Sequence, residues 1–167
     1  FTNDYSSRHD TLKDLTVKKD VTGNQGNRNK DFKFTIKVDG AAGEQYYVTF
    51  SDGKAPTTLV SGEAKTITLK DNETAKIFGL SETDEYTVTE ASYADDGYKT
   101  TIDNVETLTT TGTITGNSDK NITVVNDKTT NSPTGIFLHV APYIALIGAA
   151  IASSLLFFRR KRAKDMD

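Results

Sequence analysis

Three polar side chains are predicted to lie on the apolar faces of three separate β-strands. Side chains alternate across a strand, so residue parity assigns each one to a face. In the stretch LTVKKDV, Lys19 shares the face of the leucine and the valines. Glu90 shares the face of the tyrosine and valine in EYTVTE, and Asn126 that of the isoleucine and first valine in NITVVN. An amine, a carboxyl and a carboxamide are therefore all expected on inward faces.

If these three groups meet in a dry interior, they can react with one another. Desolvation favours the neutral amine of Lys19 and the neutral acid of Glu90. A neutral amine is a nucleophile, and a protonated carboxyl can polarise the side-chain carbonyl of Asn126. Attack of Lys19 on that carbonyl carbon would release ammonia and leave an amide, with Glu90 shuttling protons. Fixed proximity can supply an effective molarity of about 10⁵ M or more, so no external enzyme is needed.

Each residue taken alone also has an ordinary explanation. Lys19 could extend its amine to solvent, Glu90 could end its strand at the surface and Asn126 could cap a turn. Three such coincidences are disfavoured, because an unpaired buried charge is very costly. We therefore hypothesise that the side chains of Lys19, Glu90 and Asn126 lie together in the folded domain.

The elements that must position these groups are short strands. Residues 12–128 show almost no helical periodicity, and runs of Thr, Val, Ile, Phe and Tyr are broken by Gly, Asn and Asp. Two weaker strands with long turns are expected within 91–120. We expect an all-β, immunoglobulin-like antiparallel sandwich. The clearest strand candidates are 15–21, 31–38, 46–50, 66–69, 76–80, 85–90 and 121–126.

Several of these motifs together resemble the Cna protein B-type domain of Gram-positive shaft pilins. They are LTVKKDVTGN, FKFTI, ITLKDNETAKIFGL, YTVTE and VVND, and the resemblance covers residues 12–128. It implies a β-sandwich closed by an isopeptide bond between Lys19 and Asn126, with Glu90 as the catalytic acid. Lys18 is adjacent, but parity and the spacing to Gly23 favour Lys19.

The opening FTNDY (1–5) echoes VVNDK near the end of the folded region. In tandem domains of this kind the closing strand ends in an aromatic-Thr-Asn pattern. Residues 1–11 are therefore predicted to be the end of a preceding sister domain and a linker, with Asn3 as that domain's bond acceptor. The alternative is a chance FTN, because short polar matches are common.

The C-terminal region has the order of a cell-wall sorting signal. A linker, 129–135, contains NSPTG and precedes an apolar segment, 136–158, with no charged residue. That segment is long enough for a single transmembrane helix, and the basic tail at 159–167 predicts a cytoplasmic end. A sortase is then expected to cleave between Thr134 and Gly135. Ser132 stands where commoner signals have Leu or Val, and a lipid-anchor signal or a plain single-span receptor is the alternative.

Composition excludes several other function classes. The net charge of −3 includes a basic tail, so the rest of the chain is acidic and a nucleic-acid partner is not expected. The chain has no cysteine and only two histidines, His9 and His139, far apart in sequence. Neither a disulfide framework, a metal centre nor a Ser-His triad is predicted, and no cofactor is expected.

The sequence therefore predicts a structural surface protein, not an enzyme beyond one intramolecular turnover. The expected role is a pilin precursor, held in the plasma membrane and then joined by sortase at Thr134 to a neighbouring subunit or to peptidoglycan. Its final location would be the pilus or cell wall. The alternative is a wall-anchored adhesin whose ligand-binding region lies upstream, with this domain as a stalk.

Overall fold

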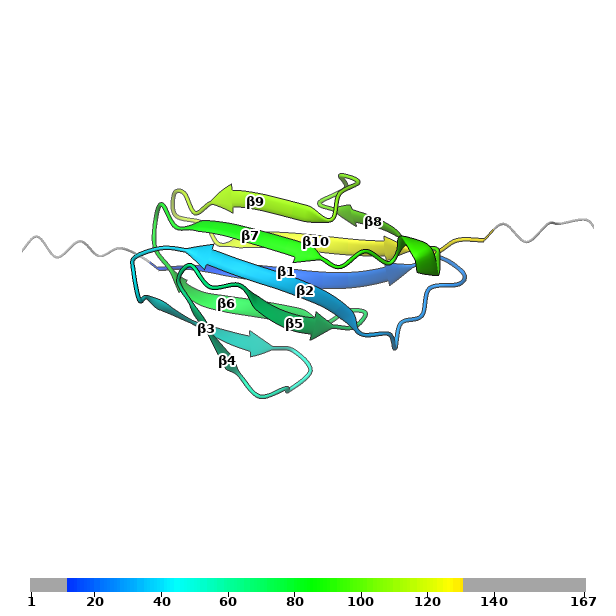
Figure 1. Cartoon of the computed structure of the whole chain (residues 1–167), viewed down its shortest axis with the longest axis horizontal. Coiled ribbons are helices and arrows are strands. Elements are labelled where there is room, and N and C mark those ends of the chain that lie inside the picture. The colour runs from blue at the N-terminus through cyan, green and yellow to red at the C-terminus, as the bar shows by residue number, and fades with distance from the viewer. Residues whose placement is uncertain (1–11, 131–167) are drawn as a thin grey trace, which may run out of the picture. The chain divides into compact units, whose positions relative to one another are not determined.

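The computed structural model describes residues 12–130, which form ten strands in two packed sheets and a short 3₁₀ turn, η1 (Ala94–Asp96) (Figure 1). The strands of the six-stranded sheet, in spatial order, are β4 (Thr57–Val60), β3 (Gln45–Phe50), β6 (Thr74–Leu80), β1 (Lys13–Thr22), β10 (Lys120–Asp127) and β8 (Lys99–Ile102). The four-stranded sheet has the order β5 (Lys65–Leu69), β2 (Phe32–Asp39), β7 (Glu85–Glu90) and β9 (Thr109–Thr113). The prediction of an all-β, two-sheet domain is confirmed.

One pairing departs from the wholly antiparallel sandwich that the sequence predicted. β1 and β10, the first and last strands, run parallel, with Leu15 opposite Lys120 and Thr22 opposite Asp127. The other pairs are antiparallel. A parallel pair needs a long crossover, and here the whole intervening domain supplies it. The chain therefore enters this strand pair at one end and leaves it at the other.

The seven clearest strand candidates each coincide with an observed strand. The weak region 91–120 holds two more, β8 and β9, as expected. The sequence prediction missed β4, whose four residues, TTLV, follow Pro56 and offer too short an alternation to detect. β4 pairs only with β3 within residues 12–130, so it forms an edge of its sheet.

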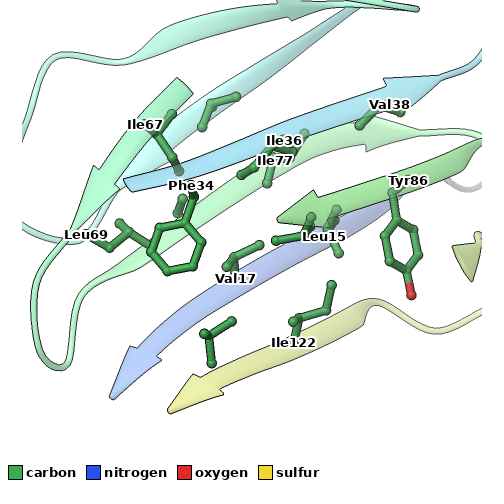
Figure 2. Close-up of a cluster of buried hydrophobic side chains, with 14 of the residues drawn as sticks. Leu15, Val17, Phe34, Ile36, Val38, Ile67, Leu69, Ile77, Tyr86 and Ile122 are labelled. Atoms are coloured by element: carbon green, nitrogen blue, oxygen red, sulfur yellow. The ribbon is translucent and has the colours of Figure 1, made fainter. Parts of the chain in front are cut away.

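The core lies between the two sheets, and burial alternates residue by residue along most of the strands that form it. In β1 every second residue from Lys13 to Val21 is buried, and β10 buries Ile122, Val124 and Asn126. Figure 2 shows Leu15, Val17 and Ile122 of the larger sheet facing side chains that include Phe34 and Tyr86 of the smaller sheet. Because side chains alternate with a period of two, a polar residue points inward whenever it is an even number of residues from the apolar residues of its strand.

Turn chemistry closes the strands. Asp103 and Asn104 both have positive φ, 49° and 68°, as a type I′ turn requires, and Ile102 bridges to Val105 across them. Gly23, with φ 87°, lies directly against the Lys128 carbonyl, where a Cβ would clash with the backbone. The turn after β1 thus packs on the segment that follows β10.

Several predictions fall outside the part of the chain that the structure describes. They are Asn3, the NSPTG motif with Thr134 and Gly135, the apolar segment 136–158 and the tail 159–167. Within residues 12–130, no helix is both long and apolar enough to cross a membrane.

Candidate functional site

Lys19 is fully buried in β1 and its backbone is held from one side. Its N–H donates to the Glu73 carbonyl at 2.9 Å, and its carbonyl accepts from Asn72 N–H at 2.8 Å. The Nζ atom donates to the carbonyl of Asp20 at 2.9 Å and to that of Val124 at 3.4 Å. The turn that joins β5 to β6 therefore fixes the strand, and the amine is directed into the space between the sheets.

Glu90 approaches the same amine from the opposite sheet. It is the last residue of β7, it is 1% exposed, and its N–H donates to the Leu108 carbonyl at 2.8 Å. Its Oε1 lies 3.5 Å from Lys19 Nζ. Its Oε2 accepts a hydrogen bond from Thr100 Oγ1 at 3.1 Å. The two carboxyl oxygens thus face different partners.

Asn126 lies on β10, between the strands that carry Lys19 and Thr100. It stands opposite Val21 in the parallel pairing with β1 and opposite Thr100 in the antiparallel pairing with β8. Lys19 stands opposite Val124, two residues earlier on the same face of β10. The Asn126 carboxamide therefore lies on the inner face of β10, the strand next to that of Lys19. It is two residues further along β10 than Val124, the residue directly opposite Lys19.

Three polar atoms of this cluster lack a hydrogen-bond partner. Among residues 12–130, the buried side-chain atoms without a hydrogen-bond partner are Asn126 Oδ1, Asn126 Nδ2 and Glu90 Oε1. Leaving one buried polar group unpaired costs about 1–3 kcal/mol, so native proteins rarely tolerate it without a reason. All three orphan atoms belong to residues that the sequence singled out for chemistry.

Burial shifts the ionisation of both titratable members toward their neutral forms. Desolvation lowers the pKa of Lys19 to about 8, although the charges of Glu90, Asp20 and Asp71 act in the opposite direction. Desolvation raises the pKa of Glu90, partly offset by the charge of Lys19 and the hydrogen bond from Thr100. A buried pair with these shifts can exist as amine and carboxylic acid, which is the combination that nucleophilic attack requires.

Aromatic rings cover the amine. Lys19 Nζ lies 4.5 Å from the centroid of the Phe32 ring. That ring packs edge-on against Tyr93 and Tyr98, with centroids 4.9 and 5.4 Å apart. The rings help to exclude water, and a low local dielectric strengthens every polar interaction within the site.

Lys19, Glu90 and Asn126, the three residues that parity predicted to point inward, are all buried, from strands β1, β7 and β10. Glu90 is the member near both others: its carboxyl lies 3.5 Å from Lys19 Nζ, and the neighbouring Asn126 side chain acts to lower its pKa. Sequence reasoning missed Thr100 and Phe32. Thr100 lies in the stretch 91–120, where the sequence pattern for strands is weakest. Phe32 could have been found, because it is in phase with the inward-facing residues of its strand.

No metal centre competes with this cluster in the described region. Between residues 12 and 130 there is no group of three or more His, Asp or Glu side chains that could hold a metal ion. Asp71 and Asn72 belong to a turn: Asn72 has φ 62°, and Asp71 Oδ1 accepts from the Val21 N–H at 2.6 Å.

The chain is similar in sequence to known pilus proteins. The chain is 37% identical to a pilin of Streptococcus pyogenes serotype M1, over 89% of this chain and 49% of the pilin. It is 33% identical to the pilus tip adhesin Cpa of Streptococcus pyogenes, over 48% of this chain and 12% of the adhesin. The chain thus spans about half the length of the pilin and a smaller part of the adhesin.

Solved structures give the same relationship. The crystal structure of the major pilin from Streptococcus pyogenes superposes with a TM-score of 0.58 at 29% identity, over 71% of this chain and 48% of that one. The pilus-presented adhesin Cpa superposes with a TM-score of 0.59 at 32% identity, over 71% of this chain and 28% of the adhesin. These relatives are structural pilus proteins, not enzymes, in line with the sequence prediction.

A family match covers nearly the whole described domain. It spans residues 13–128, from the first residue of β1 to just beyond the end of β10. The chain therefore belongs to the family described as domain of unknown function DUF7601, and its relatives include pilins and a pilus adhesin of Streptococcus pyogenes.

Proposed function

We propose that this chain is part of a pilus subunit whose sandwich cross-links itself through an amide between Lys19 and Asn126. The observation that carries the proposal is the buried cluster of amine, carboxyl and unpartnered carboxamide between two sheets. The similarity to pilins supports the structural role. The resemblance to Cna B-type domains supports the assignment of the three residues.

The reaction balances within the site. The Lys19 Nζ lone pair attacks Asn126 Cγ while Glu90, as the acid, hydrogen-bonds to Oδ1. The Cγ–Nδ2 bond then breaks, a proton from Nζ reaches Nδ2 by way of the Glu90 carboxyl, and ammonia leaves. The product is a secondary amide plus one ammonia, and Glu90 ends the cycle in the protonation state in which it began.

The exported form would be processed at its C-terminal end. The NSPTG motif, the apolar segment 136–158 and the basic tail support membrane retention followed by sortase cleavage between Thr134 and Gly135. The Thr134 carboxyl would pass to an amine of a neighbouring subunit or of peptidoglycan. The protein would then reside in the pilus or wall outside the cell, and Asn3 would serve a preceding domain in the same way as Asn126 serves this one.

Intact mass tests the cross-link directly. We expect the purified chain to weigh one ammonia less than its sequence, and Glu90→Ala and Lys19→Ala to have the full sequence mass. Two matched controls should keep the deficit: Glu85→Ala, at the exposed start of the same strand as Glu90, and Lys18→Ala, whose amine lies at the surface beside Asp20. A wild-type chain of full sequence mass would refute the assignment.

A stalk of a wall-anchored adhesin is the second candidate, favoured by the similarity to Cpa. The two functions differ in what receives the Thr134 carboxyl. A shaft pilin forms covalent ladders on a denaturing gel that depend on an acceptor lysine, whereas an anchored adhesin gives a single wall-linked species. Gel analysis of cell-wall extracts therefore separates them.

A further inference from the structure

Thr100 contacts the catalytic carboxyl although it is not one of the three reacting residues. Its side chain is buried, and β8 places it opposite Asn126 on the inner face of the sheet. Its Oγ1 donates to Glu90 Oε2 at 3.1 Å. This hydrogen bond links the carboxyl to the sheet that also carries Lys19 and Asn126.

The bond makes the two oxygens of Glu90 unequal. Oε2 accepts the Thr100 O–H, whereas Oε1 faces Lys19 Nζ at 3.5 Å and lacks a hydrogen-bond partner among the described residues. An acid proton on Oε2 would require the Thr100 hydroxyl to rotate and accept instead of donating. A proton on Oε1 leaves the Thr100 bond intact and points into the part of the site where Lys19 lies.

We propose that Thr100 is a positioning residue that directs the reactive proton of Glu90 onto Oε1. This inference rests on the cross-linking proposed above and adds to it the selection of one carboxyl oxygen. Thr100 also ties β8 to β7 across the two sheets, which fixes the rotamer of Glu90. Catalytic groups work best when a neighbouring hydrogen bond holds them in the productive geometry.

A role in packing alone makes different predictions. Valine has nearly the shape of threonine and would fill the same volume, so packing would survive Thr100→Val. Serine keeps the hydroxyl but loses the methyl group, so proton placement would survive Thr100→Ser. Thr101→Val, one residue along and on the opposite face of β8, is the matched control.

The rate of cross-linking is the measurement. Freshly synthesised full chains, kept unreacted in denaturant, are diluted to start folding, and loss of ammonia is followed by mass against time. We expect Thr100→Val to react about ten-fold or more slowly than wild type, because it loses part of the roughly 10²–10⁴-fold that a positioned acid–base group contributes. Thr100→Ser should stay within about three-fold of wild type, and Thr101→Val should match it.

The pH dependence separates proton placement from packing. Donation by Thr100 lowers the pKa of Glu90, so its removal should raise that pKa further. The limb of the pH–rate profile that reports Glu90 should then move to higher pH in Thr100→Val and stay in place in Thr101→Val. A role in packing alone predicts that this limb stays in place in both variants.

Each outcome decides the question. Wild-type rate and an unmoved profile in Thr100→Val overturn the inference while leaving the cross-link itself intact, as does equal slowing of the valine and serine variants with an unmoved profile. A wild type that never loses ammonia removes both proposals together. If circular dichroism shows that Thr100→Val is unfolded, Thr100→Ala removes the hydroxyl without adding apolar bulk, and the same comparisons apply.

Discussion

Asn126 is the residue whose surroundings are hardest to explain without a reaction. Its carboxamide is completely buried, and neither polar atom has a partner in the described region. Lys19 and Glu90 beside it carry a further desolvation cost. A covalent bond would turn this costly arrangement into a neutral amide, and the unreacted state would persist only in variants that cannot form it.

The titration of Lys19 provides a test in such a variant. In Asn126→Ala, Lys19 remains an amine with a folded pKa of about 8, below its ordinary value of 10.5. Between those pH values the unfolded chain binds more protons at Lys19 than the folded chain does. Burial of Lys19 therefore destabilises the fold to its full extent below pH 8, and this destabilisation shrinks as pH rises toward 10.5.

The comparison partner is the double variant Asn126→Ala with Lys19→Met, which lacks the titrating amine. We expect the gap in free energy of unfolding between the two variants to shift in favour of Asn126→Ala as pH rises from 8 to 10.5, measured by urea denaturation. A gap that stays constant across this range would contradict the lowered pKa.

At the scale of elements, β1 is the most constrained strand near the site. It pairs with β6 on one side and β10 on the other, and the β5–β6 turn adds the Asp71 bond to Val21 N–H. Asp71 also forms an ion pair with Arg28, at 3.2 Å. Lys19 is therefore presented from a strand whose backbone has little freedom, which is what a fixed attack geometry needs.

A second polar cluster ties β3 to the turn between β6 and β7. The buried Tyr46 hydroxyl lies 3.0 Å from both Asp84 Oδ2 and Glu44 Oε2, and Asp84 also accepts from Ser81 N–H. The backbone of Gly40 passes so close that a Cβ there would clash with the Tyr46 hydroxyl. Burial, and then the bonds to these carboxylates, raise the pKa of Tyr46, so the hydroxyl stays a donor.

Removing that hydroxyl should weaken the fold. We expect Tyr46→Phe to lower the free energy of unfolding by about 1–3 kcal/mol, because the nearly buried Asp84 loses a donor. Tyr47→Phe on the same strand is the control: its side chain is 54% exposed, and we expect a change within about 0.5 kcal/mol. Denaturation of both in the Asn126→Ala background gives the comparison, and equal effects would argue against the cluster.

At the scale of the whole domain, the parallel pairing of β1 and β10 decides how tension would pass through it (Figure 1). Tension applied at the two ends of the chain would shear this pair along its length. An amide between Lys19 and Asn126 would carry the load directly from one strand to the other. The segment between those residues would then be shielded from the force.

Single-molecule pulling should reveal this shielding. In Glu90→Ala, which cannot form the bond, unfolding should release the segment between Lys19 and Asn126 and add roughly 350–380 Å of length, from about 3.3–3.6 Å per extended residue. The cross-linked wild type should lack that step. Glu85→Ala should behave as wild type, and a wild type that extends as far as Glu90→Ala would show that the bond does not bear load.

The sequence alone determined which side chains face inward. Period-two alternation is a local property, so it placed Lys19, Glu90 and Asn126 inside and located most of the strands. The penalty for burying unpaired polar groups then suggested that the three must meet. None of this required knowledge of which strands are neighbours.

Only the tertiary structure decided the pairing. The parallel contact of β1 with β10 joins segments about a hundred residues apart, and no local pattern encodes it. The same long-range packing placed Thr100 against Glu90 and Phe32 over Lys19. Alternation determines which side chains of a strand point inward. Which side chains then contact one another across the core depends on how all the strands pack into one shared volume.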